Sequence, residues 1–572
     1  MQKTLVVCVL ICLFAATVLP ASYHSGIEAQ AESTEMNSQG DDNADLSVKW
    51  WPMFHHDPQH TGYTTATGTI VLSPVVKWSF STNGPVKSSC AVGNIVGGTF
   101  GLQVAVGSRD GTVYVMDSNG NEVWSVPTYG PIDSSPVIAD VDTSFGMEII
   151  VGSKDGSIYV FDGATGREKW SVPTSGSVVS SPVVSDIDND GRKEVIVGSK
   201  DGSIYVFDGA TGREKWSVPT TAEIESSPAV AYGNIYIGSN DNRVYCIDGD
   251  TGDVIWCYET GGKITSSPTI SGGKVYIGSW DHKLYCLDAY TGEEIWTFTT
   301  NGAIESTCAI ANIDVTFGNE VVVGSNDGRV YCIDAESGTP KWSFDTHHQI
   351  KSSPAIADID GDGKNEVVAC SRDGHIYAFD SNGDVEWEYS IGATIDSSPA
   401  IADIDGGGVE IIVGSDDGSI YVLGGPLPPK TPERPTGPTE IEYGKSYEYH
   451  TYTKDPIYKE VRYVFSWGDG KEDTTNCVDP KKGANLSHSW TKGKGKLLLY
   501  ILECKGKKYC VKCKAVACDP DTGLESGWSE ELIVTAKSKS FYCFHSLWLL
   551  QWLLDHLPPL HKSSENGGDQ DE

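Results

Sequence analysis

The chain has 572 residues, with 63 glycines but only five methionines, and its formal net charge at pH 7 is −36. This length is more than one ordinary domain needs, and frequent glycine with aromatic residues favours short strands and tight turns over long helices. The negative charge repels a phosphate backbone, so we expect no nucleic-acid partner, and it suits a medium rich in calcium or salt. An equally good interpretation is that the negative charge only keeps a secreted protein soluble.

Residues 1–31 have the three parts of a secretory signal peptide. Lys3 supplies a positive start, Leu5 to Leu19 is apolar, and Ala29 to Ala31 offers a cleavage site. The apolar run is short for a membrane span. We therefore expect an exported protein, either secreted or held at the cell surface or envelope, with disulfides permitted. An uncleaved anchor and a cut near Ala21 are the alternatives.

Residues 48–425 form a repeat. Four strand signals separated by turns with glycine and aspartate fill each unit, and Val151–Thr174 recurs unchanged as Val197–Thr220. Close variants of Gly-Ser-x-Asp and of Ser-Ser-Pro each occur eight times. Four strands at a period of 40–46 residues are typical of one propeller blade. Eight tryptophans mark the units at spacings of 46, 46, 46, 40, 40, 46 and 45 residues: Trp78, Trp124, Trp170, Trp216, Trp256, Trp296, Trp342 and Trp387.

The two ends of this repeat complete each other. The strand Val75–Phe80 carries the first tryptophan and has no blade before it, whereas the last unit ends at Ser419–Leu423 without a tryptophan strand. Pairing of these two segments would close the ring and remove an exposed sheet edge. The predicted fold class is all-β, with an eight-bladed β-propeller of four-stranded blades followed by a smaller β-sandwich.

The turn before each tryptophan resembles that of a known family. Asp162–Trp170 reads Asp-Gly-Ala-Thr-Gly-Arg-Glu-Lys-Trp, which is similar to the tryptophan-docking motif of the quinoprotein, or PQQ-repeat, propellers. Further copies are Asp208–Trp216, Asp248–Trp256, Asp288–Trp296 and, more loosely, Asp334–Trp342. The segment Trp51–Tyr63 resembles the lead-in of secreted members. The resemblance covers residues 50–425 and implies eight blades, with one tryptophan packed between each pair of neighbours.

The resemblance does not extend to the family's cofactor. Quinoprotein dehydrogenases of this type also have two adjacent cysteines, a calcium-held quinone and a catalytic aspartate, and this chain contains no Cys-Cys pair. We therefore do not predict bound PQQ or a catalytic residue. The histidines His55, His56 and His60 form a local cluster, for which the match to the lead-in favours a structural role over metal binding.

Acidic loops between the first and second strands of five blades are candidate calcium sites. The complete loops place carboxylates at positions 1, 3, 5 and 9 and glycine at position 6, which follows EF-hand logic in a shorter loop and resembles the calcium loops of FG-GAP propellers such as integrin α chains. The complete sets are Asp186, Asp188, Asp190 and Glu194, and Asp358, Asp360, Asp362 and Glu366. The degraded sets are Asp140, Asp142 and Glu148; Asp314 and Glu320; and Asp403, Asp405 and Glu410.

We predict calcium at the complete loops, with a solvated Asx turn as the alternative, above all at the degraded copies. Extracellular calcium modules bind with dissociation constants of roughly 0.1–1 mM. Calcium of that affinity would stiffen the blades rather than hold up the fold.

The last third of the chain is divided by a proline-rich linker, residues 426–439. Residues 440–536 resemble an Ig-like, PKD-type β-sandwich, with the motif Phe465-Ser466-Trp467-Gly468-Asp469-Gly470 and alternating strands around it. Residues 541–557 are apolar but interrupted, which favours either an interfacial helix that contacts a membrane peripherally or a helix docked on the sandwich. Residues 558–572 are an acidic tail. Cys246 and Cys257 flank one hairpin and are a candidate disulfide.

The first functional interpretation is an exported, calcium-binding propeller that binds an extracellular protein or glycan, with the sandwich as a spacer. The motifs GxSxG, HExxH and the P-loop are absent, which favours a binding protein over an enzyme. The alternatives are a quinone-dependent dehydrogenase or polysaccharide-active enzyme, and an envelope-assembly scaffold. The ligand itself is not encoded in the repeats, because propeller specificity depends on loops.

Overall fold

The structure is a computed structural model that describes residues 50–71, 73–97, 101–142, 146–314, 318–425, 431–443, 445–453, 461–467, 469, 471–489, 508–517, 526 and 528–537. The predicted signal peptide, interfacial helix and acidic tail lie outside these residues. All regular elements that the structure describes are β-strands, as predicted. In this part of the chain no helix has the length and apolar character needed to cross a membrane.

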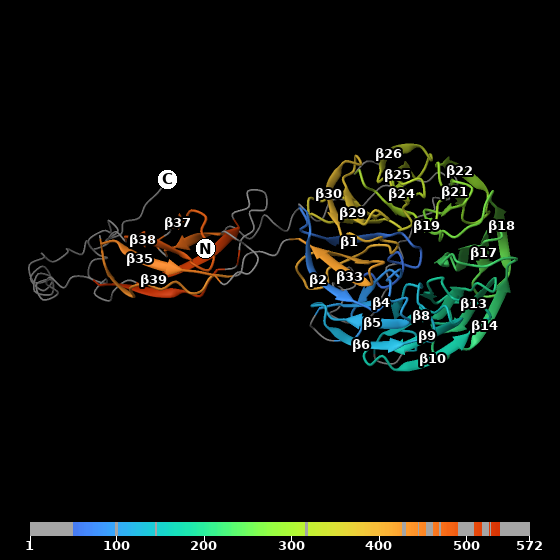
Figure 1. Ribbon diagram of the computed structural model, residues 1–572, viewed down its shortest axis with the longest axis horizontal. Helices are drawn as coiled ribbons and strands as arrows, with labels where there is room; N and C mark the ends of the chain where they lie inside the picture. The colour runs from blue at the N-terminus through green and yellow to red at the C-terminus, as the bar shows by residue number, and fades with distance from the viewer. Residues whose placement is uncertain are drawn as a thin grey trace, which may run out of the picture. The chain divides into compact units, whose positions relative to one another are not determined.

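Eight sheets form the blades of the propeller, and their colours follow chain order around the ring in Figure 1. Blades 1 to 6 each have four consecutive antiparallel strands. In blades 7 and 8 the N-terminal strands β1 and β2 join strands from the end of the repeat. Blades 1 to 4 are β3 (Ala91–Gly93), β4 (Gln103–Gly107), β5 (Thr112–Met116) and β6 (Glu122–Pro127); β7 (Val137–Ala139), β8 (Glu148–Gly152), β9 (Ser157–Asp162) and β10 (Glu168–Pro173); β11 (Val183–Ser185), β12 (Glu194–Gly198), β13 (Ser203–Asp208) and β14 (Glu214–Pro219); β15 (Ala229–Ala231), β16 (Asn234–Gly238), β17 (Arg243–Asp248) and β18 (Val254–Glu259).

The remaining blades repeat this arrangement. Blades 5 and 6 are β19 (Thr269–Ser271), β20 (Lys274–Gly278), β21 (Lys283–Asp288) and β22 (Glu294–Thr299); β23 (Ala309–Ala311), β24 (Glu320–Gly324), β25 (Arg329–Asp334) and β26 (Pro340–Asp345). Blade 7 is β27 (Ala355–Asp358), β28 (Glu366–Cys370), β29 (His375–Phe379) and β30 (Val385–Ser390), with β1 (Tyr63–Thr67) added in parallel to β27. Blade 8 is β31 (Ala400–Ala402), β32 (Glu410–Gly414) and β33 (Ser419–Gly424), completed by β2 (Val75–Ser81).

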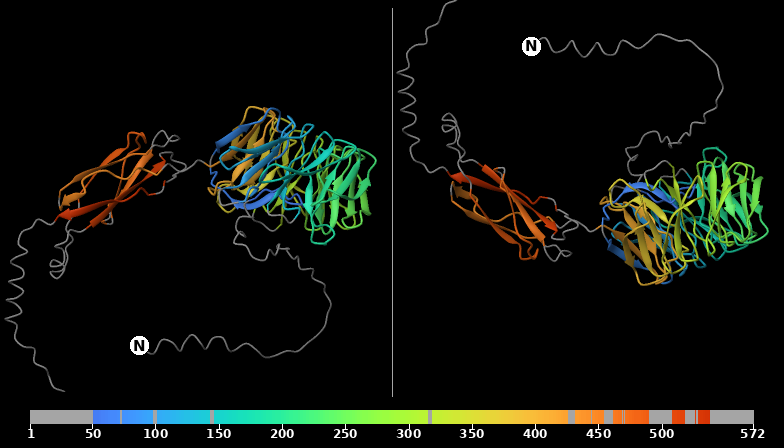
Figure 2. Two further views of the ribbon diagram at one scale, coloured as in Figure 1. Left: turned by 90° about the horizontal axis from the view of Figure 1, so that it is seen from below. Right: turned by 90° about the horizontal axis from the view of Figure 1, so that it is seen from above.

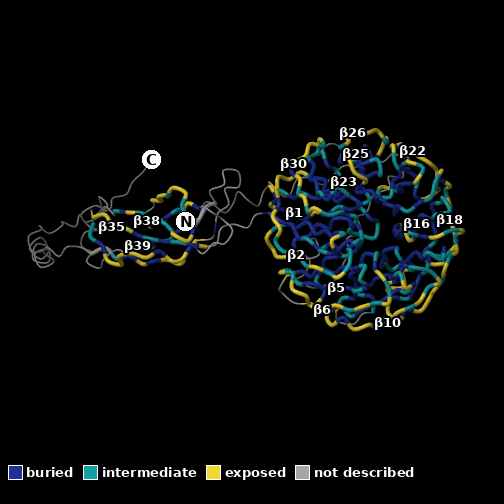
Figure 3. The backbone as a smooth tube through the Cα atoms, in the orientation of Figure 1, coloured by how far each residue is buried: buried dark blue, intermediate teal, exposed yellow. Residues whose placement is uncertain are grey.

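The burial of each strand follows from its place in the blade. The first strands of neighbouring blades contact one another around the axis, and the second strands, such as β12, are buried at every position except the half-buried first residues of β16 and β20. These strands are packed on both faces, which is why they read as continuous apolar runs. The fourth strands, such as β14, alternate between half-buried and exposed residues on the rim, as Figure 3 shows in teal and yellow.

The ring closes as predicted. Strand β2 pairs antiparallel with β33, and Trp78 lies opposite Val422. A second closure runs through buried serines at the axis: the Ser398 backbone N–H donates to Ser89 Oγ over 3.0 Å, although the two residues lie 309 positions apart. The same bond links every pair of neighbouring blades at 2.9–3.2 Å, through Ser89, Ser135, Ser181, Ser227, Ser267, Thr307, Ser353 and Ser398.

The tryptophans dock between blades. Trp170 on β10 of blade 2 donates its Nε1–H to the Gly209 carbonyl of blade 3 over 2.9 Å, and its ring covers Gly212. Gly212 has a φ of 69°, and an ideal Cβ there would lie 2.7 Å from the ring, so the turn requires glycine on both grounds. Seven turn glycines meet the tryptophan of the preceding blade in this way: Gly120, Gly166, Gly212, Gly252, Gly292, Gly338 and Gly383.

The N-terminal segment from Trp51 to Ile70 runs along the inner strands. Its carbonyls accept backbone N–H groups from the first strands of six blades, at Val92, Ile138, Val230, Ile270, Ile310 and Ile356. The imidazoles of His55 and His60 are buried within it and contact the carbonyls of Pro354 and Pro268 at 2.9 and 3.0 Å. The histidine cluster is therefore part of the packing between segment and blades, in line with the structural role expected from the sequence.

The C-terminal part contains two further sheets, drawn in orange and red in Figure 2. One has the order β34 (Glu440–Glu442), β40 (Leu532–Lys537), β39 (Lys508–Ala517), β36 (Val461–Ser466) and β37 (Glu472–Thr474), and the other pairs β35 (Tyr447–Thr451) with β38 (Ala484–His488). Their side chains share one apolar core around Trp467, which stacks on His488 with ring centroids 4.7 Å apart. A two-sheet architecture was predicted here, and its assignment to the PKD type stays a prediction.

Candidate metal centre in the acidic loops

Each long blade with an acidic loop begins its second strand with a buried glutamate that holds the loop in place. In blade 3, Glu194 Oε2 accepts the backbone N–H of Ile187 over 3.1 Å, and the apolar Ile187 side chain anchors the loop below it. The equivalent bonds in the other blades measure 2.8–2.9 Å and join Glu148 to Val141, Glu320 to Ile313, Glu366 to Ile359 and Glu410 to Ile404. One carboxylate oxygen is thus committed to the backbone, and the other faces the loop.

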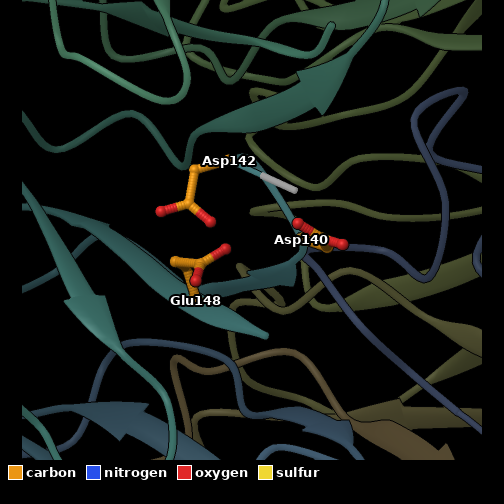
Figure 4. A group of neighbouring side chains, drawn as sticks. All are labelled: Asp140, Asp142 and Glu148. Carbon is orange, nitrogen blue, oxygen red and sulfur yellow. The ribbon is translucent and has the colours of Figure 1, made fainter. Parts of the chain in front are cut away.

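Four loops bring three carboxylates together, with one oxygen of each within 4.8 Å of the others. Figure 4 shows the group in blade 2, where the carboxylates of Asp142 and Glu148 face each other beside Asp140. The groups, all formed by loop positions 1 and 3 and the buried glutamate, are Asp140, Asp142 and Glu148; Asp186, Asp188 and Glu194; Asp358, Asp360 and Glu366; and Asp403, Asp405 and Glu410.

The predicted ligands at position 5 lie outside these groups. Asp190 accepts the Arg192 backbone N–H over 2.8 Å, and Asp362 accepts the Lys364 N–H and pairs with its ammonium at 2.7 Å. Blade 6 offers only the pair Asp314 and Glu320. The sequence pattern therefore identified loop positions 1, 3 and 9 as neighbours, whereas the contribution of position 5 would need the loop to rearrange around an ion.

In four blades a lysine occupies the space between the carboxylates. Lys215 in blade 3 places Nζ 2.5 Å from Asp188 Oδ2 and 2.7 Å from Glu194 Oε1. Burial alone would lower the pKa of Lys215, but the two carboxylates outweigh it and raise that pKa, so the ammonium is charged. Equivalent pairs of contacts join Lys77 to Asp405 and Glu410, Lys169 to Asp142 and Glu148, and Lys341 to Asp314 and Glu320.

A β-bulge aims these lysines at the loops. The residue before each tryptophan is skipped in the pairing of the third and fourth strands: in blade 3, Trp216 lies opposite Val206 and Glu214 opposite Phe207, which leaves Lys215 unpaired. A bulged residue is turned relative to its neighbours. The bulge recurs in all eight blades, so each blade has one side chain at this position.

Blade 7 is the exception among the acidic loops, because its bulge carries Glu386 instead of lysine. Burial raises the pKa of Glu366 to about 8, and the carboxylates of Glu386 and Asp360 add to the shift. The pKa of Glu386 is raised as well, first by partial burial and then by Asp360. The three clustered carboxylates of this loop are therefore accompanied by an acidic residue at the bulge of β30 instead of a lysine.

The role of the bulge position was not predicted from the sequence, although a signal for it is present in the chain. The residue before the tryptophan is lysine in four of the five blades whose second strand starts with glutamate. It is Val123, Ile255 or Ile295 in the blades that start this strand with Gln103, Asn234 or Lys274. In the four blades with lysine, the side chains at the two positions are in contact.

A separate cavity of about 540 Å³ lies where the N-terminal segment meets blades 5 to 7. Polar side chains line much of it, including His56, Asp57, Thr61, Asn319 and Asn365. In turns of the short blades 4 and 5, which have no acidic loop, the exposed rings of Tyr232 and Tyr290 pack with centroids 5.1 Å apart.

Comparisons with known proteins agree with this architecture. The family model described as outer membrane protein assembly factor BamB matches residues 75–298 and 243–422, and these matches together span more than half of the chain. The europium-containing methanol dehydrogenase has a similar structure, with a TM-score of 0.53 and 14% sequence identity over 67% of this chain and 100% of that chain.

Two further solved structures match with lower TM-scores. BamB from Moraxella catarrhalis has a TM-score of 0.48 and 18% identity, over 61% of this chain and 97% of its own. The computationally designed Ika8 protein has a TM-score of 0.47 and 20% identity, over 60% and 98%. No curated protein matched the sequence. At these identities the likeness to solved structures concerns the fold alone.

Proposed function

The chain belongs to the family described as outer membrane protein assembly factor BamB, and from this premise we propose that it is an exported propeller scaffold that binds a protein or glycan ligand at the cell envelope or surface. The observation that carries the proposal is the polar cavity of about 540 Å³ between the N-terminal segment and blades 5 to 7. Hydroxyl and amide side chains in a concave site favour a ligand rich in hydroxyl or amide groups.

The scaffold around this cavity supports a binding role. The N-terminal segment and the serine hydrogen bonds between neighbouring blades tie the blades together at the axis, and the β2–β33 pairing closes the ring in blade 8. A rigid frame lowers the ordering cost of binding, and its loops are free to supply specificity. The exposed pair Tyr232 and Tyr290 adds an aromatic surface at turns of blades 4 and 5, which suits stacking on a sugar ring or a peptide.

Calcium binding by the acidic loops is the second part of the proposal. Carboxylate oxygens are the ligands that hard divalent cations prefer, and calcium accepts the irregular geometry of such loops. The ion would act on stability and rigidity rather than on chemistry. A quinone-dependent dehydrogenase gains no support from the residues, since the chain has no Cys-Cys pair.

An assembly scaffold for envelope proteins is the second candidate function, which the family's description favours. In that case the ligand is a protein partner rather than a glycan. The two candidates share the propeller and differ only in what occupies the cavity and the aromatic surface of Tyr232 and Tyr290.

The test is co-sedimentation of the full-length protein with cell envelopes of the source organism, in calcium and in EGTA. Saturable pelleting that is weakened in the cavity variant Asn319→Ala, and retained in the remote surface variant Arg243→Ala, is the expected result. Envelopes treated with protease or with glycosidase separate the protein ligand from the glycan. Vesicles of envelope lipid alone measure adhesion through the apolar C-terminal segment. The cavity would be excluded as the binding site if both variants pelleted equally, or if the wild-type protein did not pellet with envelopes at all.

A further inference from the structure

Blade 7 differs from its four sister blades in net charge. In blade 3 the carboxylates of Asp186, Asp188 and Glu194 face one ammonium, so three negative charges and one positive charge leave a net −2. In blade 7 the bulge position next to the group Asp358, Asp360 and Glu366 holds Glu386, so four acidic side chains and no bulge lysine are present, and burial together with Glu386 and Asp360 raises the pKa of Glu366. Like charges this close destabilise one another unless a cation or a proton intervenes.

Building on the calcium binding proposed above, we propose that the acidic loop of blade 7 is the calcium-dependent site of the propeller, with Glu386 as an additional ligand, and that the bulge lysine replaces the ion in blades 2, 3, 6 and 8. Lys215 Nζ contacts one oxygen of Asp188 and one of Glu194, which is where an ion shared by these carboxylates would sit. The lysine thus supplies a covalently attached positive charge in these four blades, whereas the acidic loop of blade 7 requires a bound calcium ion.

The orientation of Glu366 supports this assignment independently of the acidic sequence. Its side chain is only 2% exposed, and Oε2 is bonded to the Ile359 N–H over 2.9 Å. The other oxygen receives no hydrogen bond or ion pair from the described residues, whereas in the four sister blades the same oxygen, Oε1, contacts lysine. One oxygen of Glu366 lies within 4.8 Å of oxygens of Asp358 and Asp360. A carboxylate oxygen without a partner on so buried a side chain is costly, and a metal ion is the partner that fits.

The nearby Lys364 does not replace the missing ammonium. Its Nζ lies 2.7 Å from Asp362 Oδ2, outside the carboxylate group, and its side chain is more than half exposed. It comes from the loop itself rather than from the bulge of β30. Lys364 therefore lowers the charge of the loop surface without meeting the oxygen of Glu366.

The site is connected to the N-terminal segment through the backbone. Asp358, which offers its side chain to the cluster, accepts the Gly68 N–H with its carbonyl over 2.8 Å, and Ile359 accepts the Ile70 N–H over 2.8 Å. A cation that fixes the blade 7 loop therefore also fixes this part of the segment against the blade. The amides of Gly68 and Ile70 consequently report on the site without any ligand or activity assay.

Two measurements on the full-length protein test the proposal. Equilibrium dialysis at up to about 10 mM calcium, above the dissociation constants of extracellular sites, gives the number of calcium ions bound. Hydrogen exchange of the peptide containing Gly68 and Ile70 reports on the segment beside the site. Glu386→Lys installs the residue found in the sister blades and should bind one calcium fewer than the wild type. Glu388→Lys makes the same charge change two residues along β30 and should leave the count unchanged. Lys215→Glu recreates the blade 7 set in blade 3 and should bind one calcium more.

Calcium should slow exchange at Gly68 and Ile70 in the wild type and in Glu388→Lys, and have no effect there in Glu386→Lys, whose exchange is already slow. Equal calcium counts in Glu386→Lys and wild type, with the same exchange response, would overturn the assignment to blade 7 while leaving calcium binding elsewhere intact. A wild type that binds no calcium would remove both this inference and the calcium part of the proposed function. The envelope-binding test is separate and survives either result.

Discussion

Lys77, on the strand that closes the ring, places its ammonium between the carboxylates of Asp405 and Glu410 in the last blade, and Glu410 lies 333 residues further along the chain. The Lys77 side chain is 9% exposed and that of Glu410 is fully buried. The same contact that neutralises the acidic loop of blade 8 therefore also fastens the N-terminal strand to it. Loop charge and ring closure are coupled at this seam.

Replacing Lys77 should open this seam. Lys77→Met keeps the apolar stem but leaves Glu410 buried without its partner, and loss of one member of a buried pair costs about 3–5 kcal/mol. Urea unfolding measures the loss. Arg243→Met removes an exposed pair with Glu259, and because solvent screens such a pair its loss should barely change the stability. A loss as small as that of Arg243→Met would show that the seam does not depend on the ion pair.

The glycines under the tryptophans should be far less tolerant than other glycines with positive φ. Gly212→Ala would drive a methyl group to 2.7 Å from Trp170, whereas Gly191, with a φ of 84°, has no atom within 4 Å of its ideal Cβ. Both changes strain the backbone by about 1–2 kcal/mol, and Gly212→Ala adds an overpacking cost of about 1–3 kcal/mol. Thermal unfolding of the two variants gives the comparison. Equal effects would mean that the ring can shift away from the turn.

Acid should weaken the contact between the N-terminal segment and the blades. Burial, assisted by the neighbouring His55, lowers the pKa of His60 to about 4 from its usual value near 6.5. Below pH 6.5 His60 is therefore protonated in the unfolded chain, whereas in the folded chain it stays neutral until the pH falls to about 4. The contribution of neutral His60 to the free energy of unfolding is fully present above pH 6.5 and is lost, by about 3 kcal/mol, as the pH drops to 4.

His60→Asn is the matched variant for this pH dependence. Asparagine tolerates the φ of 57° at this position and can donate to the Pro268 carbonyl as Nδ1 does, but it does not titrate. Unfolding free energies measured between pH 7 and 4 should fall less steeply in the variant than in the wild type. Parallel curves would place the acid sensitivity in other groups.

Thiol labelling should distinguish one cysteine of the propeller from the rest. The predicted disulfide between Cys246 and Cys257 is wrong: both are free, and they occupy adjacent, non-opposed positions of the β17–β18 pairing. Cys257 is exposed, whereas burial raises the pKa of Cys246 to about 12. Maleimide labelling of the native protein with peptide mapping should modify Cys257 but not Cys90, Cys246, Cys286, Cys308, Cys332 or Cys370. Labelling of these buried thiols at a similar rate would indicate opening of the blades.

Much of the propeller follows from local features of the sequence. The tryptophan spacing, the turn glycines and the strand signals lie within single repeats, so they identify the blades, their number and the docking of Trp170 on Gly212 without long-range information. The pairing of β2 with β33 was also predictable, because the repeat leaves one strand over at each end. The acidic loops were recognisable for the same reason: their ligands are close in sequence.

What the loops can do depends on residues that are distant along the chain. Lys215 lies 21 residues after Glu194, and Lys77 precedes Glu410 by 333, so no loop motif contains the group that neutralises it. The bulge before each tryptophan turns that group toward the loop, and only the paired strands reveal it. The sequence by itself determined the blades, their order and the positions of the carboxylates. The tertiary structure decided which carboxylates already have a cation, because charge balance depends on side chains that meet across strands rather than along the chain.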